Sequence, residues 1–152
     1  MKILVGVDGS PCSAEAVAEV ASRPWPRGSE VMVLSVAHSH VPQIPDPFFI
    51  MYAAHEESLE EELRSAGNCA RDAARRIEAN PAIRRVTTEV LEGTPGSVIV
   101  KEAERLHADL VVLGCHGYGV VHRFLRGSVS QAVLLHAPCS VEVVRSHDRT
   151  AA

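Results

Sequence analysis

Hydrophobic residues recur along this chain with two different periods, and the two alternate from one end to the other. Short apolar or alternating runs, rich in β-branched side chains, occur at residues 2–8, 31–36, 83–91, 109–113 and 140–145. Runs of this length and composition are typical of strands. Between them, apolar residues return every three or four positions, the spacing of an amphipathic helix. The pattern therefore predicts strands and helices in strict alternation.

Turn residues set the expected helix boundaries. Ser10 or Ser13 can cap the first helix, and Ser97 is expected to cap the third. The second helical pattern runs from Leu59 to Ile77, and the glutamates clustered before and within its first turns predict a solvated face. Before it, three prolines between His38 and about Met51 predict a loop that is long for a compact domain.

The alternation predicts an α/β fold, an open five-stranded, Rossmann-like parallel sheet with helices on both faces. With 152 residues, 46% of them apolar, the chain has the size of one domain. We expect that domain over residues 1–146 and a disordered tail over 147–152. In such sheets, ligands bind beyond the carboxyl ends of the strands, where the strand order reverses. Here those ends are at Asp8, Ala37 and Gly114.

Charge and cysteine content narrow the classes of partner. A net charge of −4 and a pI near 6.0 argue against binding to nucleic acid, which needs an excess of Lys and Arg. No run approaches the roughly 20 apolar residues that span a bilayer, and the N-terminus lacks the features of a secretory signal. The four cysteines are scattered without a C-x-x-C pair, so we expect no disulfides. From the absence of a membrane span and of a secretory signal, we expect no membrane partner and a cytoplasmic location.

Glycines gather where a ligand is expected. Gly114, Gly117 and Gly119 follow the fourth strand, and Gly127-Ser128-Val129-Ser130 precedes the fourth helix. Glycines can turn backbone N–H groups toward one anion, and a helix start favours a phosphate. The alternative is that the glycines only form tight turns and that Ser128 is only a cap. The spacing fits neither the P-loop nor the dinucleotide fingerprint, and by itself it leaves both interpretations open.

The pattern Gly114-x2-Gly117-x9-Gly127-Ser128, together with the opening ILVGVDGS, resembles the nucleotide-binding signature of the universal stress protein family. The resemblance covers essentially the whole chain. It implies an adenine nucleotide alpha hydrolase-like fold and places the phosphates and ribose at Gly114, Gly117, Gly127, Ser128, Val129 and Ser130. It further implies that Asp8 and Val36 meet the adenine and that the pocket is lined by Gly6, Val7 and Leu113.

Several positions have two interpretations. Asp8 either accepts a hydrogen bond from the ligand or caps the turn that follows it. His116 either touches a phosphate or faces solvent, as do Arg123 and Arg126. Cys115 departs from the small hydroxyl residue common in the family, which predicts a lower affinity for the nucleotide.

The resemblance implies binding of ATP, or of ADP or AMP, with Mg²⁺ carried by the nucleotide, in a regulatory or stress-response protein. It also implies a homodimer formed through the last strand, Val141 to Arg145, which would cover a sheet edge. No Asp or Glu occurs between Leu110 and Gln131, so we assign no catalytic residue and expect at most slow hydrolysis. No Cys and His set predicts a metal site. The alternatives are a weak hydrolase or phosphotransferase, or a protein-interaction module that acts through residues 39–54.

Overall fold

The computed structural model describes residues 1–37, 50–115 and 129–145. The elements in chain order are β1 (Lys2–Val7), α1 (Pro11–Ser22), β2 (Ser29–Ala37), α2 (Ile50–Glu78), β3 (Ile83–Glu92), α3 (Pro95–Leu106), β4 (Leu110–Cys115), α4 (Val129–His136) and β5 (Ser140–Arg145). This order confirms the predicted alternation. The expected tail, residues 147–152, and most of the expected loop after His38 lie outside the described residues.

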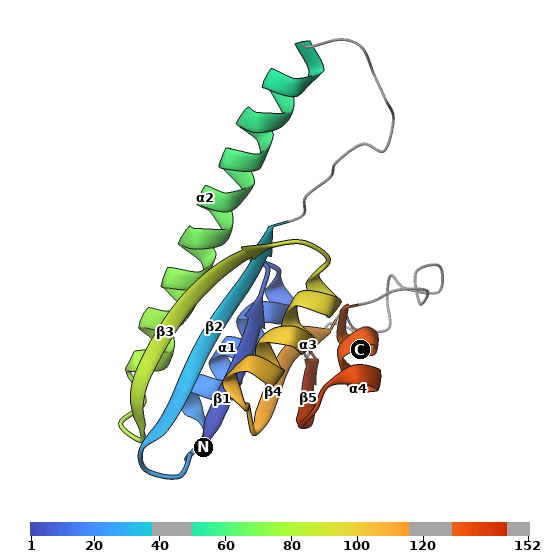
Figure 1. Ribbon diagram of the computed structural model, residues 1–152. Helices are drawn as coiled ribbons and strands as arrows, with labels where there is room; N and C mark the ends of the chain where they lie inside the picture. The colour runs from blue at the N-terminus through green and yellow to red at the C-terminus, as the bar shows by residue number, and fades with distance from the viewer. Residues whose placement is uncertain (38–49, 116–128, 146–152) are drawn as a thin grey trace, which may run out of the picture.

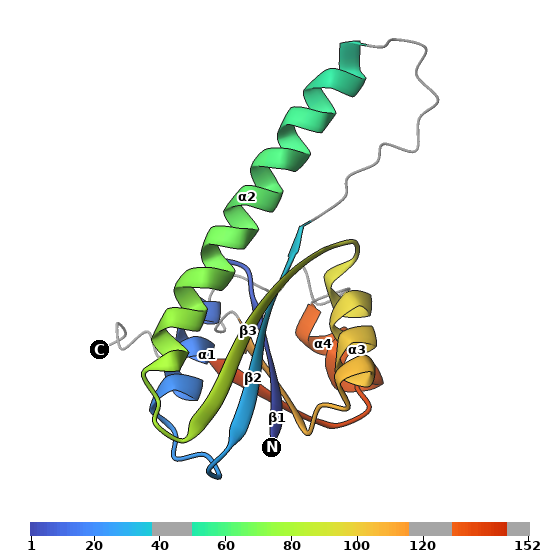
Figure 2. The ribbon, with the colours of Figure 1, turned by 60° about the vertical axis from the view of Figure 1, so that its left-hand side comes forward.

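All five strands form one parallel sheet in the order β3-β2-β1-β4-β5 (Figure 1). The chain steps outward from β1 to β3 and then returns to the other side of β1. Because parallel crossovers are right-handed, the change of direction moves the later helices to the opposite face. Accordingly α1 and α2 cover one face and α3 and α4 the other (Figure 2). The predicted Rossmann-like fold is confirmed, and its strand order reverses between β1 and β4.

Each face of the sheet has its own hydrophobic core. Beneath α1 and α2 lie side chains that include Ile3, Val5, Val33, Val112, Val20 and Ile77. Beneath α3 and α4 lie Leu4, Leu34, Val111, Leu113, Ile99 and Val133. Successive residues of β1, β2 and β4 therefore alternate between two buried faces, which explains why these strands are apolar without interruption.

The starts of α1 and α3 settle the predicted caps. The Ser10 hydroxyl accepts a hydrogen bond from the backbone N–H of Ser13 at 3.1 Å, so Ser10 is the cap of α1. The prediction that Ser97 caps α3 is wrong, because the helix begins earlier, at Pro95. Proline lacks the N–H that the first turn leaves unpaired and has a helical φ, so it starts the helix before Ser97 is reached. Ser97 instead lies exposed within α3.

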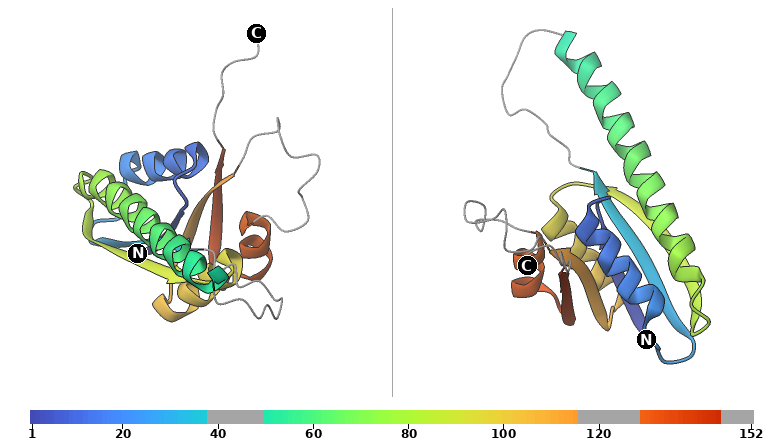
Figure 3. Two further views of the ribbon diagram at one scale, coloured as in Figure 1. Left: turned by 90° about the horizontal axis from the view of Figure 1, so that it is seen from above. Right: turned by 180° about the vertical axis from the view of Figure 1, so that it is seen from behind.

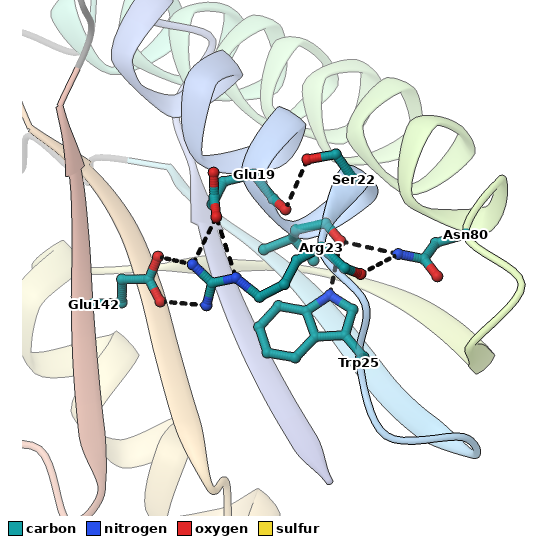
Figure 4. Close-up of polar contacts among 7 residues, drawn as sticks. Glu19, Ser22, Arg23, Trp25, Asn80 and Glu142 are labelled. Atoms are coloured by element: carbon teal, nitrogen blue, oxygen red, sulfur yellow. Dashed lines mark hydrogen bonds and ion pairs between the residues drawn. The ribbon is translucent and has the colours of Figure 1, made fainter.

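The carboxyl end of α1 is closed by a residue from another element. The side-chain amide of Asn80, after α2, donates to the carbonyl oxygens of Ala21 and Arg23 at 3.0 and 2.9 Å (Figure 4). The side-chain oxygen Oδ1 of Asn80 accepts from the backbone N–H of Ala82 at 3.0 Å. Asn80 is buried, and these contacts satisfy carbonyl groups that a helix end leaves without partners.

Arg23 joins the same end of α1 to β5. Its guanidinium donates to both carboxylate oxygens of Glu142 at 2.7 and 2.6 Å, and also to Glu19 one turn back on α1 (Figure 4). The Trp25 ring lies under the guanidinium carbon at 4.9 Å. Two-pronged carboxylate pairing fixes the geometry as well as the charge, so α1 is fastened to the last strand of the sheet.

The second helix is longer than the sheet that it covers. It has 29 residues, and its early turns continue past the carboxyl ends of the strands (Figure 1; Figure 3, right). Its later turns are anchored in the core by Ala70, Ala73, Ala74 and Ile77. Within the described ranges, no helix combines the length and the apolar character needed to cross a bilayer.

Candidate functional site

A cavity of about 320 Å³ opens at the carboxyl ends of β1, β2 and β4. It lies where the strand order reverses, the position at which open parallel sheets bind ligands. Its walls come from the three strand ends and from all four helices. The described lining residues are Gly6, Val7, Asp8, Gly9, Ser10, Cys12, Ser13, Leu34, Ser35, Val36, Ala37, Glu62, Ser65, Ala66, Cys69, Pro95, Ile99, Leu113, Gly114, Val129 and Ser130.

Every predicted site residue within the described ranges lines this cavity, namely Gly6, Val7, Asp8, Val36, Leu113, Gly114, Val129 and Ser130. The remaining predicted residues, His116, Gly117, Gly127 and Ser128, lie outside the described residues, as do Arg123, Arg126 and the side chain of Cys115. The fold therefore brings residues as distant in sequence as Gly6 and Ser130 to the same cavity.

A larger hollow of about 780 Å³ lies around Trp25 and Asn80, near the ends of α1 and α2. It is at the amino end of the strands and contains none of the predicted site residues. Two of its arginines are already paired, Arg23 with Glu142 and Arg84 with Glu30. Since parallel sheets bind ligands at the opposite end, the smaller cavity is the candidate site.

Gly6 keeps the floor of the cavity open. A Cβ built on this residue would lie 2.5 Å from the Leu113 Cδ2 and 3.5 Å from the Ile99 Cδ1. Because β1 pairs with β4, any side chain at position 6 competes with Leu113 for the same space. The absence of a side chain therefore lets Leu113 rest against the strand and leaves the volume above it free.

Gly114 is a glycine for a reason that the sequence did not reveal. A Cβ on it would lie 2.6 Å from the backbone nitrogen of Ser13 and closer still to the carbonyl of Cys12. The first turn of α1 thus packs directly on the end of β4. The predicted role of Gly114 in turning N–H groups toward a phosphate stays a prediction, and packing alone accounts for this glycine.

Asp8 caps the turn after β1. Its Oδ1 accepts a hydrogen bond from the backbone N–H of Ser10 at 2.9 Å, and between them Gly9 has a φ of +77° that glycine adopts readily. The capping interpretation is therefore confirmed. The carboxylate also lines the cavity, so its predicted role toward a ligand is compatible with the cap.

Sequence reasoning missed the wall that α2 contributes. Glu62, Ser65, Ala66 and Cys69 all line the cavity, and their spacing places them on one face of the helix. The predicted solvated face is borne out for Glu60, Glu61 and Glu62, which are all exposed, but Glu62 also lines the cavity. The sequence signal that could have identified this wall is that Glu62, Ser65 and Cys69 lie on one helical face together with the apolar Ala66. Ser35 was also missed: its buried hydroxyl donates to the Val7 carbonyl oxygen at 2.9 Å and ties β2 to β1.

The electrostatics of the cavity are one-sided. Among its described lining residues, Asp8 and Glu62 carry negative charge and none is Lys, Arg or His. Burial raises the pKa of the Cys69 thiol, and the charge of Asp8 raises it further, although the backbone N–H of Gly9 acts in the opposite direction by hydrogen bonding to the sulfur. Across the described ranges, no three His, Cys, Asp or Glu side chains are grouped as a metal would require.

The start of α4 has the opposite character. The helix begins with Val129 and Ser130 at the cavity, where a helix presents backbone N–H groups and the positive end of its dipole. The described carboxylates of the cavity therefore lie at the end of β1 and on α2, whereas the start of α4, like that of α1, offers backbone N–H donors. An elongated molecule with an anionic group at one end and hydroxyl or amino groups at the other fits this distribution.

Known proteins resemble this chain over nearly its full length. A curated relative from Staphylococcus aureus (strain USA300), named as a universal stress protein, is 28% identical over 147 residues, covering 96% of this chain and 84% of the relative. The solved structure of universal stress protein UspA from Lactobacillus plantarum is 27% identical with a TM-score of 0.75, covering 95% of this chain and 97% of that one.

More distant structures share the fold and were solved with nucleotides. A universal stress protein family protein from Arabidopsis thaliana with AMP bound is 19% identical, with a TM-score of 0.59, over 100% of this chain and 96% of that one. The structure of the universal stress protein from Archaeoglobus fulgidus in complex with dAMP is 22% identical, with a TM-score of 0.61, over 95% of this chain and 97% of that one. The sequence model of the Universal stress protein family matches residues 1–145, and the chain belongs to that family.

Proposed function

We propose that this chain binds an adenine nucleotide and acts as a nucleotide-dependent regulatory protein in a stress response, with ATP, ADP or AMP as the ligand. One observation carries the proposal. The described residues that the family signature implies for the nucleotide all line a single cavity at the switch point of the sheet. The AMP and dAMP in relatives of the same fold support the adenine nucleotide as the class of ligand.

The proposed orientation follows the polarity of the cavity. The phosphates lie at the start of α4, near Val129 and Ser130, and the adenine lies over Val36 and Gly6 on the β1 and β2 side. The half-buried Val36 and the buried Leu113 and Ile99 give the base an apolar surface. A Mg²⁺ ion, if required, arrives with the phosphates of ATP.

Titration calorimetry of the purified chain with ATP, ADP and AMP, with and without Mg²⁺, tests the proposal. We expect saturable binding at one site per chain. Ser130→Ala should weaken it, because this side chain lines the cavity, whereas Gln131→Ala, exposed on the next position of the same helix, serves as the matched control. A chain that binds none of the three nucleotides would overturn the proposal in favour of the protein-interaction module.

Measuring ATP turnover distinguishes a nucleotide-dependent regulatory protein from an enzyme. Nucleotide released from the purified protein by denaturation is identified, and added ATP is followed for product. We expect ATP to remain intact over many binding cycles, since Asp8 and Glu62 are the cavity's described carboxylates and Asp8 already caps a turn. Many turnovers per chain would support the hydrolase or phosphotransferase alternative.

We further propose a cytoplasmic homodimer formed through β5. Among the described strands, β5 pairs with β4 alone and so has one unpaired edge. On neighbouring α4, Leu134 and Leu135 are 55% and 71% exposed. Sedimentation should give twice the chain mass, and Leu135→Glu should shift it toward the monomer. A monomeric unsubstituted chain would contradict the dimer.

A further inference from the structure

One wall of the cavity comes from α2, and its polar side chains have no assigned role. Glu62, Ser65 and Cys69 line the cavity together with Ala66. Positions separated by three, four and seven residues lie on one face of a helix, so the wall is a continuous stripe. Of Glu60, Glu61 and Glu62, the glutamates whose side chains the structure describes in this part of α2, Glu62 is the one that lines the cavity.

The lower end of this stripe is held in position. The Cys69 sulfur packs against Gly9, 3.8 Å from where a Cβ on that glycine would stand, and the next turns of α2 are buried in the core. One helical turn rises about 5.4 Å, so Ser65 lies about one turn and Glu62 about two turns beyond Cys69. Since α2 continues past the strand ends (Figure 1), Glu62 lines the cavity from a part of the helix that is farther from the core than Cys69 is.

The chemistry of this wall is that of an acceptor. A carboxylate accepts hydrogen bonds from hydroxyl and amino groups and repels phosphate. Glu62 and Asp8 are the charged groups among the described lining residues, and both are acidic. The anionic end of a ligand is therefore directed away from Asp8 and Glu62, toward a helix start such as that of α4, and the α2 wall faces the end that carries hydroxyl and amino donors.

We propose that Glu62, assisted by Ser65, is a specificity-determining residue that accepts a hydrogen bond from a donor on the nucleoside part of the ligand. This inference rests on the proposed function, because it concerns the same cavity. The donor is either a ribose hydroxyl or the amino group of adenine, and the two share the same hydrogen-bond chemistry. In either case a residue of α2 contacts the nucleoside, while the start of α4 contacts the phosphate.

The test measures dissociation constants of the full chain and of its Glu62→Ala and Ser65→Ala variants by calorimetry. The ligands are AMP, 2′-deoxy-AMP, 3′-deoxy-AMP and IMP, which lacks the 6-amino group. Glu61→Ala is the matched control, since Glu61 is an exposed neighbour on the same helix that does not line the cavity. It reports the effect of removing one negative charge from this region.

We expect Glu62→Ala to weaken AMP binding by about tenfold relative to Glu61→Ala, the lower range for a hydrogen bond to a charged group because Glu62 is exposed. For the one ligand that lacks the donor, the two variants should bind within about twofold of each other. That ligand identifies the donor as the 2′-hydroxyl, the 3′-hydroxyl or the amino group. Ser65→Ala should show the same ligand preference with a smaller loss.

Two results would overturn the inference alone while leaving the proposed function intact. In the first, the unsubstituted chain binds AMP and Glu62→Ala matches Glu61→Ala with every ligand. In the second, Glu62→Ala binds AMP more tightly than Glu61→Ala does, so that Glu62 acts only as a repelling charge. Failure of the unsubstituted chain to bind any of the ligands would overturn the inference and the proposed function together.

Discussion

Gly114 at the end of β4 lies directly against the backbone of Cys12 in the first turn of α1. A Cβ at position 114 would come within 2.6 Å of the Ser13 nitrogen and closer still to the Cys12 carbonyl. Both neighbours are backbone atoms of a capped helix start, so neither can rotate away as a side chain would. The contact sets how closely the start of α1 packs on the end of β4.

Gly114→Ala should therefore destabilise the fold by about 1–3 kcal/mol, as overpacking of an interior does. Gly67→Ala provides a control of opposite sign. Gly67 lies within α2, where a Cβ would meet only the flexible Arg71 guanidinium at 3.5 Å, and alanine should gain about 0.5–1 kcal/mol in a helix. Urea unfolding measures both, and an unchanged midpoint for Gly114→Ala would disprove the close contact.

Gly6→Ala should affect the cavity more than the fold. The new methyl group meets the Leu113 side chain at 2.5 Å, and that side chain can turn into the free volume above it. We expect nucleotide affinity to fall about tenfold, or about 1.4 kcal/mol. The Gly6→Ala, Leu113→Ala double variant should recover part of the affinity at a cost in stability, and no recovery would mean that Leu113 is not the obstruction.

Asn80→Asp should destabilise the chain by about 1–3 kcal/mol near neutral pH, because it places a carboxylate against carbonyl oxygens that now receive hydrogen bonds. Those carbonyls disfavour the charged form, so the carboxyl pKa in the folded state should exceed its unfolded value of about 3.9. The folded chain then binds protons more tightly than the unfolded chain.

The stability of Asn80→Asp should consequently recover as the pH falls through the folded pKa of the new carboxyl group. Asn80→Ala loses the same hydrogen bonds without gaining a charge and should show no such recovery relative to the unsubstituted chain. Parallel pH profiles of the two variants would contradict the direct contact between the side chain and these carbonyls.

Cys69 offers a chemical probe of the site. Burial and the charge of Asp8 raise the pKa of its thiol, and the thiolate is the species that reacts with iodoacetamide. At pH 8 we expect slower alkylation of Cys69 in the native chain than in urea, measured by peptide mass spectrometry. The native rate should still be rising at a pH where the rate in urea has levelled off.

The same shift has a consequence for stability. Because the folded pKa of Cys69 is raised, the folded state holds this proton more tightly, and the corresponding stabilisation is present below the unfolded pKa and is lost as the pH rises through the folded one. Bound nucleotide should protect Cys69 further, because the thiol lines the cavity. Equal alkylation rates with and without saturating nucleotide would place the ligand elsewhere.

The fold was predictable because its signals are local and repeated. The β-branched runs and the three-to-four-residue spacing each arise from one element, and their alternation implies the sheet. The predicted site residues within the described ranges share one cavity because parallel strands bring their carboxyl ends together. Contacts between distant elements left no local signal. Gly114 is required by α1, and Glu62 lines the cavity because α2 extends past the ends of the strands (Figure 1).

The contacts at the two ends of α1 make this helix a mechanical link. Its first turn touches Gly114 and the cavity, and Arg23 at its far end grips Glu142 on β5. Twelve helical residues form a rod of about 18 Å between these points. A helix this short does not bend appreciably. A ligand that displaces its first turn would therefore also displace Arg23 and, through the contact with Glu142, the strand β5.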